Sequence, residues 1–396
     1  MAWRPDASQL KEVACVPYDV INTEEAIELA IGKKKSFLHV IRPEIDLEPG
    51  TDLYSDAVYE KGAENLEKFC SDGTLIQENH PTVYVYRLIR NGKPQFGLFV
   101  NVSVDDYDND LILKHELTRP DKEDDRTRHI ITQKAHAEPV LLTYRGKDDI
   151  NARVAKITEE NTPLYDFTAD DGIQHTIWKT DSPEFFEDAF KNVKSLYVAD
   201  GHHRCKSASR TAEAMRAENP DYTGDESWNF FPAVLVPMEQ MEILAYNRVI
   251  HRVSQDTFDK LRADLNLKPT DSDTPDEKGR VCIYFAGSWY SMDLPVADTP
   301  NAVEKLDASR LQQHVLEPYF GIKNPRTDKN ISFVGGIRGT AELTRLVNTG
   351  KAQLAISMYP TSIEELVEVS DAGLLMPPKS TWFEPKLRSG LLVHRF

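Results

Sequence analysis

The strongest constraint on the fold is a pair of β-type runs between residues 82 and 104. The stretch TVYVYRLIRNGKPQFGLFVNVSV alternates with the period of a strand on both sides of Asn91-Gly92-Lys93-Pro94. Asn-Gly is a strong hairpin signal, because both residues tolerate the positive φ angles of a tight turn between antiparallel strands. Elsewhere, strand-like and helix-like segments alternate without strict βαβ regularity. The sequence therefore predicts an α+β fold with a mixed sheet.

Two early segments have the apolar spacing of helices. They are TEEAIELAI (23–31) and YSDAVYEKGAENLEKFCSDG (54–73), and the second ends at Gly73 as a glycine-capped helix does. Between them, SFLHVIRPEID (36–46) predicts a strand that leads into a proline-marked loop. No repeat, low-complexity tract or flexible linker interrupts the chain. We therefore expect one compact body with three packed subdomains, covering residues 1–95, 96–255 and 256–396.

The stretch LYVADGHHRCKSASR (196–210) joins an apolar strand to a helix through a polar cluster. Apolar residues recur after it at helical spacing, so the cluster lies at the strand-to-helix turn. Gly201 permits a sharp turn, and first-turn amides have no partner inside a helix. With the helix dipole, His202, His203 and Arg204 would then form a phosphate cradle. Asp200 would assist a metal or take a proton, whereas a merely capped helix is the structural alternative.

Four other stretches carry candidate site residues. HELTR begins like a zinc-protease helix, but Arg119 stands where H-E-x-x-H needs its second histidine, which disfavours that chemistry. Each remaining stretch taken alone fits a structural role as well as a functional one. The candidates are Tyr18 in VPYDVI, His39, Arg42 and Glu44 in HVIRPE, Glu116 and Arg119 in HELTR, and Lys379 and Ser380 in PPKSTW.

Composition and charge exclude several classes of function. The 64 acidic and 47 basic residues give a net charge of −17, which argues against a broad nucleic-acid surface. The sequence has neither a signal-peptide core nor an apolar run of transmembrane length, so we expect a cytoplasmic protein. The four cysteines form no C-x-x-C pair, as in a protein with reduced thiols. Neither a Walker A loop nor a G-x-G-x-x-G fingerprint is present, so any phosphate site uses another scaffold.

Six motifs together resemble a widespread family long catalogued as a conserved domain of unknown function. They are VPYDVI, FLHVIRPEIDL, KHELTRPDKEDDRTRHI, ADGHHR, YNRVIH and MPPKSTWFEPKLRSG, and they span nearly the whole chain. The Asp-Gly-His-His-Arg motif is also similar to that of free L-serine kinases in the ParB and sulfiredoxin superfamily. Sulfiredoxins have a nucleophilic cysteine at the position of His202, and ParB proteins, which bind DNA, have Gly-Glu-Arg-Arg.

This resemblance implies a ParB/sulfiredoxin-like core with additional N-terminal and C-terminal α/β elements. It also implies a kinase that transfers phosphate from ATP, in preference to ADP, to free L-serine. The product would be O-phospho-L-serine for cysteine biosynthesis. A nucleotide-binding regulatory protein and a metal-dependent hydrolase are the alternatives. The residues leave open the nucleotide, the choice between serine and another small hydroxyl compound, and the oligomeric state.

The predicted roles follow from the demands of phosphoryl transfer, which needs positioning and charge neutralisation. Gly201, His202, His203, Arg204, Lys379 and Ser380 are assigned to the donor phosphates, and Mg²⁺ bridges the phosphate oxygens with help from Asp200. Asp200 and His203 are assigned to catalysis, and either Glu44 or Glu116 accepts the hydroxyl proton. Arg42, Arg119, Tyr18 and His39 are assigned to the substrate, with an arginine on its carboxylate.

Overall fold

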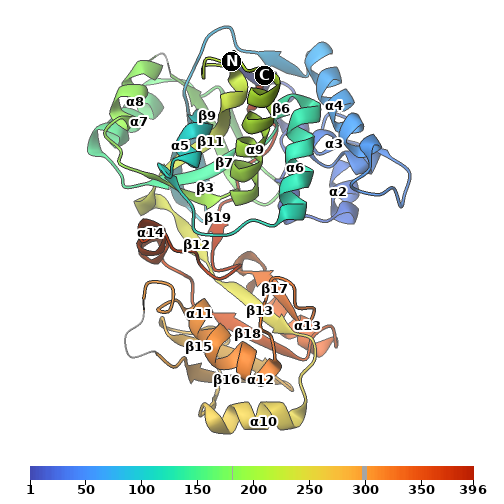
Figure 1. The fold of residues 1–396 in the computed structure, drawn as a ribbon, viewed down its shortest axis with the longest axis vertical. Coiled ribbons are helices and arrows are strands. Elements are labelled where there is room, and N and C mark those ends of the chain that lie inside the picture. Colours follow the sequence, from blue (N-terminus) through green and yellow to red (C-terminus); the bar gives the residue numbers. More distant parts are fainter. Residues whose placement is uncertain (181, 297–300) are drawn as a thin grey trace. The chain divides into compact units, whose positions relative to one another are not determined.

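The computed structural model describes residues 1–180, 182–296 and 301–396, which form two compact units (Figure 1). The first unit comprises residues 1–113, 118–241 and 385–396, and the second comprises 114–117 and 242–384. The boundary expected at residue 95 falls inside strand β4 (Lys93–Ser103). The division into 1–95, 96–255 and 256–396 therefore differs from these units, because hairpin pairing holds β4 in one sheet with its neighbours.

An eight-stranded mixed sheet forms the centre of the first unit. Strand β10 pairs with β5 in parallel and with β7 in antiparallel orientation, so the sheet is mixed, as predicted. The predicted hairpin is confirmed, since Asn91 and Gly92 have φ angles of 51° and 74° between β3 and β4. In sheet order the strands are β5 (Ile112–Leu113), β10 (Leu196–Asp200), β7 (Val140–Tyr144), β11 (Phe230–Pro237), β4, β3 (Tyr84–Arg90), β9 (Gln174–Lys179) and β8 (Tyr165–Thr168).

Helices α5 (Val104–Asp108), α6 (Pro120–Gln133), α7 (Asp148–Glu160), α8 (Pro183–Phe190) and α9 (His202–Glu218) accompany this sheet. Helix α9 contributes Cys205, Ala208 and Ala212 to the buried core, together with Leu142 and Leu235 of the strands. Helix α6 lies between α9 and the N-terminal helix α4 (Asp56–Ser71), as Figure 1 shows. The first turn of α9 is thus fixed by packing on both the sheet and α6.

The N-terminal segments and the chain end share a four-stranded sheet. Its order is β2 (Leu75–Gln77), β1 (Ala2–Pro5), β20 (Val393–Arg395) and β6 (Ala135–His136). Short helices α1 (Leu10–Val13), α2 (Thr23–Ala30) and α3 (Leu38–Ile41) lie between β1 and α4, with 3-10 turns at Tyr18–Val20 and Pro43–Asp46. The C-terminal strand therefore belongs to the same unit as the N-terminus.

The strand predicted over residues 36–46 is wrong, because this segment forms α3 and a 3-10 turn. The amide of Asn65 in α4 donates to the His39 carbonyl at 2.7 Å and to Asp46 Oδ2 at 2.8 Å. His39 Nδ1 lies 2.8 Å from Asp46 Oδ1. These contacts with a neighbouring helix hold the segment in a helical turn, so tertiary contacts override the β propensity of its apolar residues.

The second unit has its own six-stranded antiparallel sheet and core. The strand order is β14 (Lys268–Thr270), β16 (Ser288–Asp293), β15 (Arg280–Phe285), β18 (Leu354–Met358), β13 (Tyr246–Ile250) and β17 (Ile331–Gly335). A separate pair joins β12 (Glu242–Leu244) to β19 (Trp382–Glu384). The helices are α10 (Gln255–Asp264), α11 (Asp307–Leu311), α12 (Glu317–Phe320), α13 (Gly339–Asn348) and α14 (Ile363–Asp371). Among the described residues of both units, no helix is long and apolar enough to span a membrane.

Candidate functional site

The predicted strand-to-helix turn is confirmed where β10 ends at Asp200 and α9 begins at His202. Gly201 joins them with a φ angle of 103°, which an L side chain rarely adopts. A Cβ atom at this position would lie 3.0 Å from Val140 Cγ1 and 3.1 Å from Arg204 Nε. Both the backbone conformation and the space around it therefore require glycine here.

Arg204 is the central side chain of the site and is only 9% exposed. One terminal nitrogen donates to the carbonyl of Pro139. The other, Nη2, lies 3.5 Å from Asp200 Oδ2 and 3.8 Å from Asp19 Oδ2. Burial opposes the positive charge, but the two carboxylates outweigh it and raise the pKa of Arg204 above its usual value. The guanidinium is therefore a fixed charge next to two acids.

Asp200 lies between two cations. Its Oδ2 atom is 3.3 Å from Lys386 Nζ on the C-terminal segment, in addition to its contact with Arg204. Burial alone would favour the neutral acid, yet Lys386 and Arg204 hold the pKa of Asp200 well below its usual range. The carboxylate is consequently ionised at neutral pH and can orient a hydroxyl group or bind a cation.

Glu138 contributes a further acid beside Arg204. Its Oε1 atom accepts hydrogen bonds from the Tyr18 amide at 3.1 Å and from the Ser389 hydroxyl at 2.8 Å. Burial raises the pKa of Glu138, although Arg204 acts in the opposite direction. The Tyr18 ring is stacked against Arg126, whose guanidinium carbon is 4.2 Å from the ring centroid. Four segments far apart in the sequence therefore meet here.

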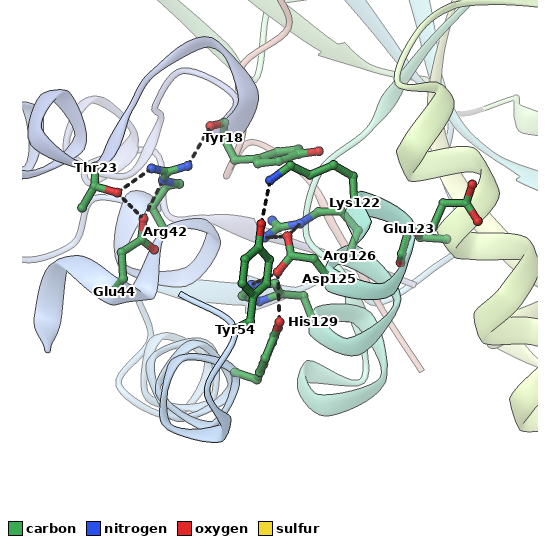
Figure 2. A network of polar contacts seen from close by, with 12 residues as sticks. Tyr18, Thr23, Arg42, Glu44, Tyr54, Lys122, Glu123, Asp125, Arg126 and His129 are labelled. Carbon is green, nitrogen blue, oxygen red and sulfur yellow. Dashed lines mark hydrogen bonds and ion pairs between the residues drawn. The ribbon is translucent and has the colours of Figure 1, made fainter. Parts of the chain in front are cut away.

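Arg42 and Glu44 form an ion pair with each other (Figure 2). Arg42 Nε lies 2.9 Å from Glu44 Oε1, and the Thr23 hydroxyl donates to the same oxygen at 3.2 Å. Arg42 also donates to Thr23 Oγ1 at 3.0 Å and to the Tyr18 carbonyl at 3.4 Å. This pair supports the Tyr18 loop, and its charges are already compensated within the protein.

Within the first unit, the structure brings several of the predicted residues together. The residues that lie around Arg204 or in the turn before it are Tyr18, Asp200, Gly201 and His202. The imidazole of His203 accepts a hydrogen bond from the Arg119 amide at 3.1 Å. The Arg119 side chain pairs with Asp121 at 2.8 Å and is largely exposed.

Three predicted residues, Glu116, Lys379 and Ser380, belong to the second unit. The Ser380 hydroxyl donates to the Pro377 carbonyl at 2.8 Å, and Lys379 Nζ lies 5.5 Å from the centroid of the Tyr246 ring. In the first unit, His39 is held by Asp46. These side chains thus have structural contacts of their own.

Sequence reasoning did not select Asp19, Glu138, Lys386 or Ser389 as site residues. Asp19 directly follows Tyr18 in VPYDVI, and Lys386 and Ser389 lie in EPKLRSG. Both segments are polar and belong to motifs of the sequence, so their positions carry a usable signal. Glu138 stands in the short HAEPV stretch without any motif, so only the fold reveals it.

Comparisons with known proteins complete the description. Among solved structures, C-terminally truncated SbnI from Staphylococcus aureus is 14% identical, covering 74% of this chain and 85% of that one with a TM-score of 0.39. A conserved hypothetical protein from Pyrococcus furiosus is 13% identical, with coverages of 72% and 90% and a TM-score of 0.35. A free serine kinase in complex with AMP is 10% identical, with coverages of 72% and 86% and a TM-score of 0.37.

The family comparison covers most of the chain. No curated protein matches this sequence. The model of the family described as protein of unknown function (DUF1015) matches residues 1–309, which include the Asp200-to-Arg204 turn. The chain belongs to the DUF1015 family.

Proposed function

We propose that the first unit is a nucleotide-dependent kinase that phosphorylates the hydroxyl group of free L-serine. The observation that carries this proposal is the buried Arg204 in the first turn of the 17-residue helix α9, directly after a glycine with positive φ. A guanidinium and the first-turn amides of a helix together favour an anion with several oxygens. Phosphate groups of a nucleotide have this chemistry, and the motif's resemblance to free serine kinases supplies the acceptor.

Two carboxylates beside Arg204 would provide the metal ligand and the proton acceptor that phosphoryl transfer requires. Asp19 and Asp200 both contact Arg204 Nη2, so they lie on one side of the guanidinium. Asp200 fits a Mg²⁺ site, because Mg²⁺ binds one or two carboxylates together with phosphate oxygens, and this leaves Asp19 available beside it. The metal would supply neutralisation of charge on the transferring group. Lys386 adds a positive charge at Asp200 that would offset part of the phosphate charge.

We assign the acceptance of the hydroxyl proton to Asp19. Glu44 is less suited to this role, because Arg42 and Thr23 occupy its Oε1 atom. The side chain of Asp19 is 37% exposed and is therefore open to a substrate. In the proposed reaction the serine oxygen forms a bond to the terminal phosphorus of ATP. The bond from that phosphorus to the bridging oxygen breaks, ADP leaves, and the serine proton passes to the carboxylate.

The proposal is tested by incubating the full chain with L-serine, Mg²⁺ and either ATP or ADP, and measuring O-phospho-L-serine by mass spectrometry. We expect product with wild type, little product with Arg204→Ala, and wild-type rates with His80→Ala, which alters an exposed residue outside the site. Nucleotide binding without product from either donor would contradict a kinase and indicate a regulatory protein. Metal-dependent hydrolysis without transfer to serine would indicate a hydrolase.

A further inference from the structure

A small cavity of the first unit lies against Arg204. Its polar wall consists of Arg126, His129, Gln133, His136, Glu138 and Arg204, and apolar side chains complete the lining. The cavity offers about 40 Å³ to the centres of water-sized atoms. By the same measure, one water molecule needs about 10–15 Å³, so the cavity holds about three waters. Each water occupies about 30 Å³ in the liquid, so the cavity would hold a molecule of about 90 Å³. This volume suits a three-carbon polar compound.

Three nitrogen atoms on this wall have no hydrogen-bond partner among the described residues. They are His129 Nδ1, His136 Nε2 and Arg204 Nε. The three residues are 6%, 4% and 9% exposed, so bulk water does not satisfy them. A buried polar group without a partner costs about 1–3 kcal/mol, and such groups in native proteins bond to other protein groups or to ordered water. Three of them around one cavity require that whatever fills the cavity is polar.

The charges around the cavity have both signs. Arg126 lies on the wall but is paired with Asp125, whose Oδ2 is 2.7 Å from Arg126 Nη2. Arg204 keeps its Nε donor available after its terminal nitrogens have contacted Pro139, Asp19 and Asp200. Glu138 provides a carboxyl group of which only Oε1 is hydrogen-bonded within the described part of the chain. A molecule with a carboxylate and an ammonium group on one carbon matches this arrangement, because each of its charges would face an opposite charge.

We propose that this cavity is the acceptor subsite of the kinase and that it binds a small zwitterionic amino acid. The amino acid's carboxylate faces Arg204 and the imidazoles of His129 and His136, its ammonium group faces Glu138, and its hydroxyl group faces Asp19 beside Arg204. This inference rests on the proposed kinase function and replaces Arg42, which is compensated by Glu44, as the carboxylate ligand. It also assigns a specificity role to Glu138, because a compound without an ammonium group would leave that carboxyl group unmatched.

The test is calorimetric titration of the full chain with L-serine, N-acetyl-L-serine and glycerol. We expect wild type to bind L-serine and neither of the other two compounds. Glu138→Gln keeps an oxygen for the Tyr18 amide but removes the charge, so it should weaken L-serine binding at least tenfold and leave the nucleotide affinity unchanged. Glu187→Gln, at an exposed position of α8, should bind L-serine as wild type does. His136→Phe fills the space and should also weaken binding.

The outcomes separate this inference from the kinase proposal. Phosphorylation of serine with an unchanged KM in both Glu138→Gln and His136→Phe would overturn the subsite and leave the kinase in place. Binding of L-serine that Glu138→Gln abolishes, without phosphorylation by wild type, would support the subsite and contradict the kinase. Equal binding of glycerol and L-serine, or no binding of any amino acid, would overturn recognition of a zwitterion.

Discussion

Asp200 has the most strongly perturbed environment of the acids in the site, since its carboxylate contacts both Lys386 and Arg204. We predict that Asp200→Asn lowers kcat by at least about 100-fold, the lower end of what a positioned acid or base contributes. The change also leaves two cations without their carboxylate, at a cost of about 1–3 kcal/mol in unfolding free energy. Both quantities are measured by steady-state kinetics and urea unfolding.

Asp188→Asn is the matched control for this substitution. Asp188 also contacts a lysine, Lys191 at 2.7 Å, but on an exposed face of α8. An exposed pair of that kind contributes little to stability and should not affect turnover. If Asp200→Asn lowers only the stability and the folded variant retains wild-type kcat, Asp200 has a structural role and the assigned chemistry is wrong.

Glu138 gives a pH-dependent prediction. Burial raises the pKa of Glu138, so the folded protein holds this proton more tightly than the unfolded chain does. The contribution of Glu138 to stability therefore falls as the pH rises above the pKa of this side chain in the unfolded chain, about 4.3. Glu138→Gln removes that loss, and we expect the variant to gain stability relative to wild type between pH 4 and pH 7. Urea unfolding at several pH values measures the difference, and parallel profiles would contradict the prediction.

Individual site residues were only partly predictable from the sequence. Asp200, Gly201 and Arg204 are adjacent in the chain, so their proximity follows from one strand-to-helix turn. Asp19 and Glu138 are more than sixty residues from Arg204 in the sequence, and only the fold brings them next to it. The sequence pattern around each residue does not predict this proximity. Arg42 and Glu44 have the residue types of a site, but only the three-dimensional contacts show that they neutralise each other.

At the scale of elements, the turn between β10 and α9 gives the clearest prediction. Gly201→Ala places a Cβ on a backbone with φ of 103° and within 3.1 Å of Arg204 Nε. We expect a loss of about 1–3 kcal/mol in unfolding free energy from the backbone conformation, and a reduced nucleotide affinity because Arg204 must shift. Urea unfolding and nucleotide titration measure the two effects.

Gly172→Ala separates backbone strain from displacement of Arg204. Gly172 has a φ angle of 80°, but a Cβ there would meet nothing within 4 Å. This control should lose stability similarly while its nucleotide affinity stays at the wild-type value. Equal nucleotide affinity in both variants would show that the position of Arg204 does not determine phosphate binding.

Elements with strong local signals were predictable, and elements defined by their neighbours were not. Asn91-Gly92 specifies the β3–β4 hairpin because the residues themselves favour the turn. The segment 36–46 has the β-branched residues of a strand, yet Asn65 on α4 supplies hydrogen bonds that fit a helical turn. The parallel pairing of β10 with β5 likewise depends on contacts across the fold.

At the scale of the whole molecule, the C-terminal segment completes the first unit. Residues 385–396 bring Lys386 and Ser389 to the site, and β20 pairs with both β1 and β6. We predict that a chain ending at residue 384 loses thermal stability and activity together, because β20 leaves the middle of its sheet. Lys386→Met, in contrast, keeps the strand and should mainly lower kcat. Calorimetry and kinetics on both variants measure this difference, and full stability of the truncated chain would contradict it.

We propose that the β10–α9 turn binds the phosphates of the donor nucleotide. A crystal structure of the full chain with Mg²⁺ and a non-hydrolysable ATP analogue tests this. We expect phosphate oxygens at the first-turn amides of α9 and within hydrogen-bond distance of Arg204, with the terminal phosphate facing Asp19 and Asp200. A nucleotide bound elsewhere, with Arg204 still surrounded only by its protein partners, would show that the turn is not the phosphate site.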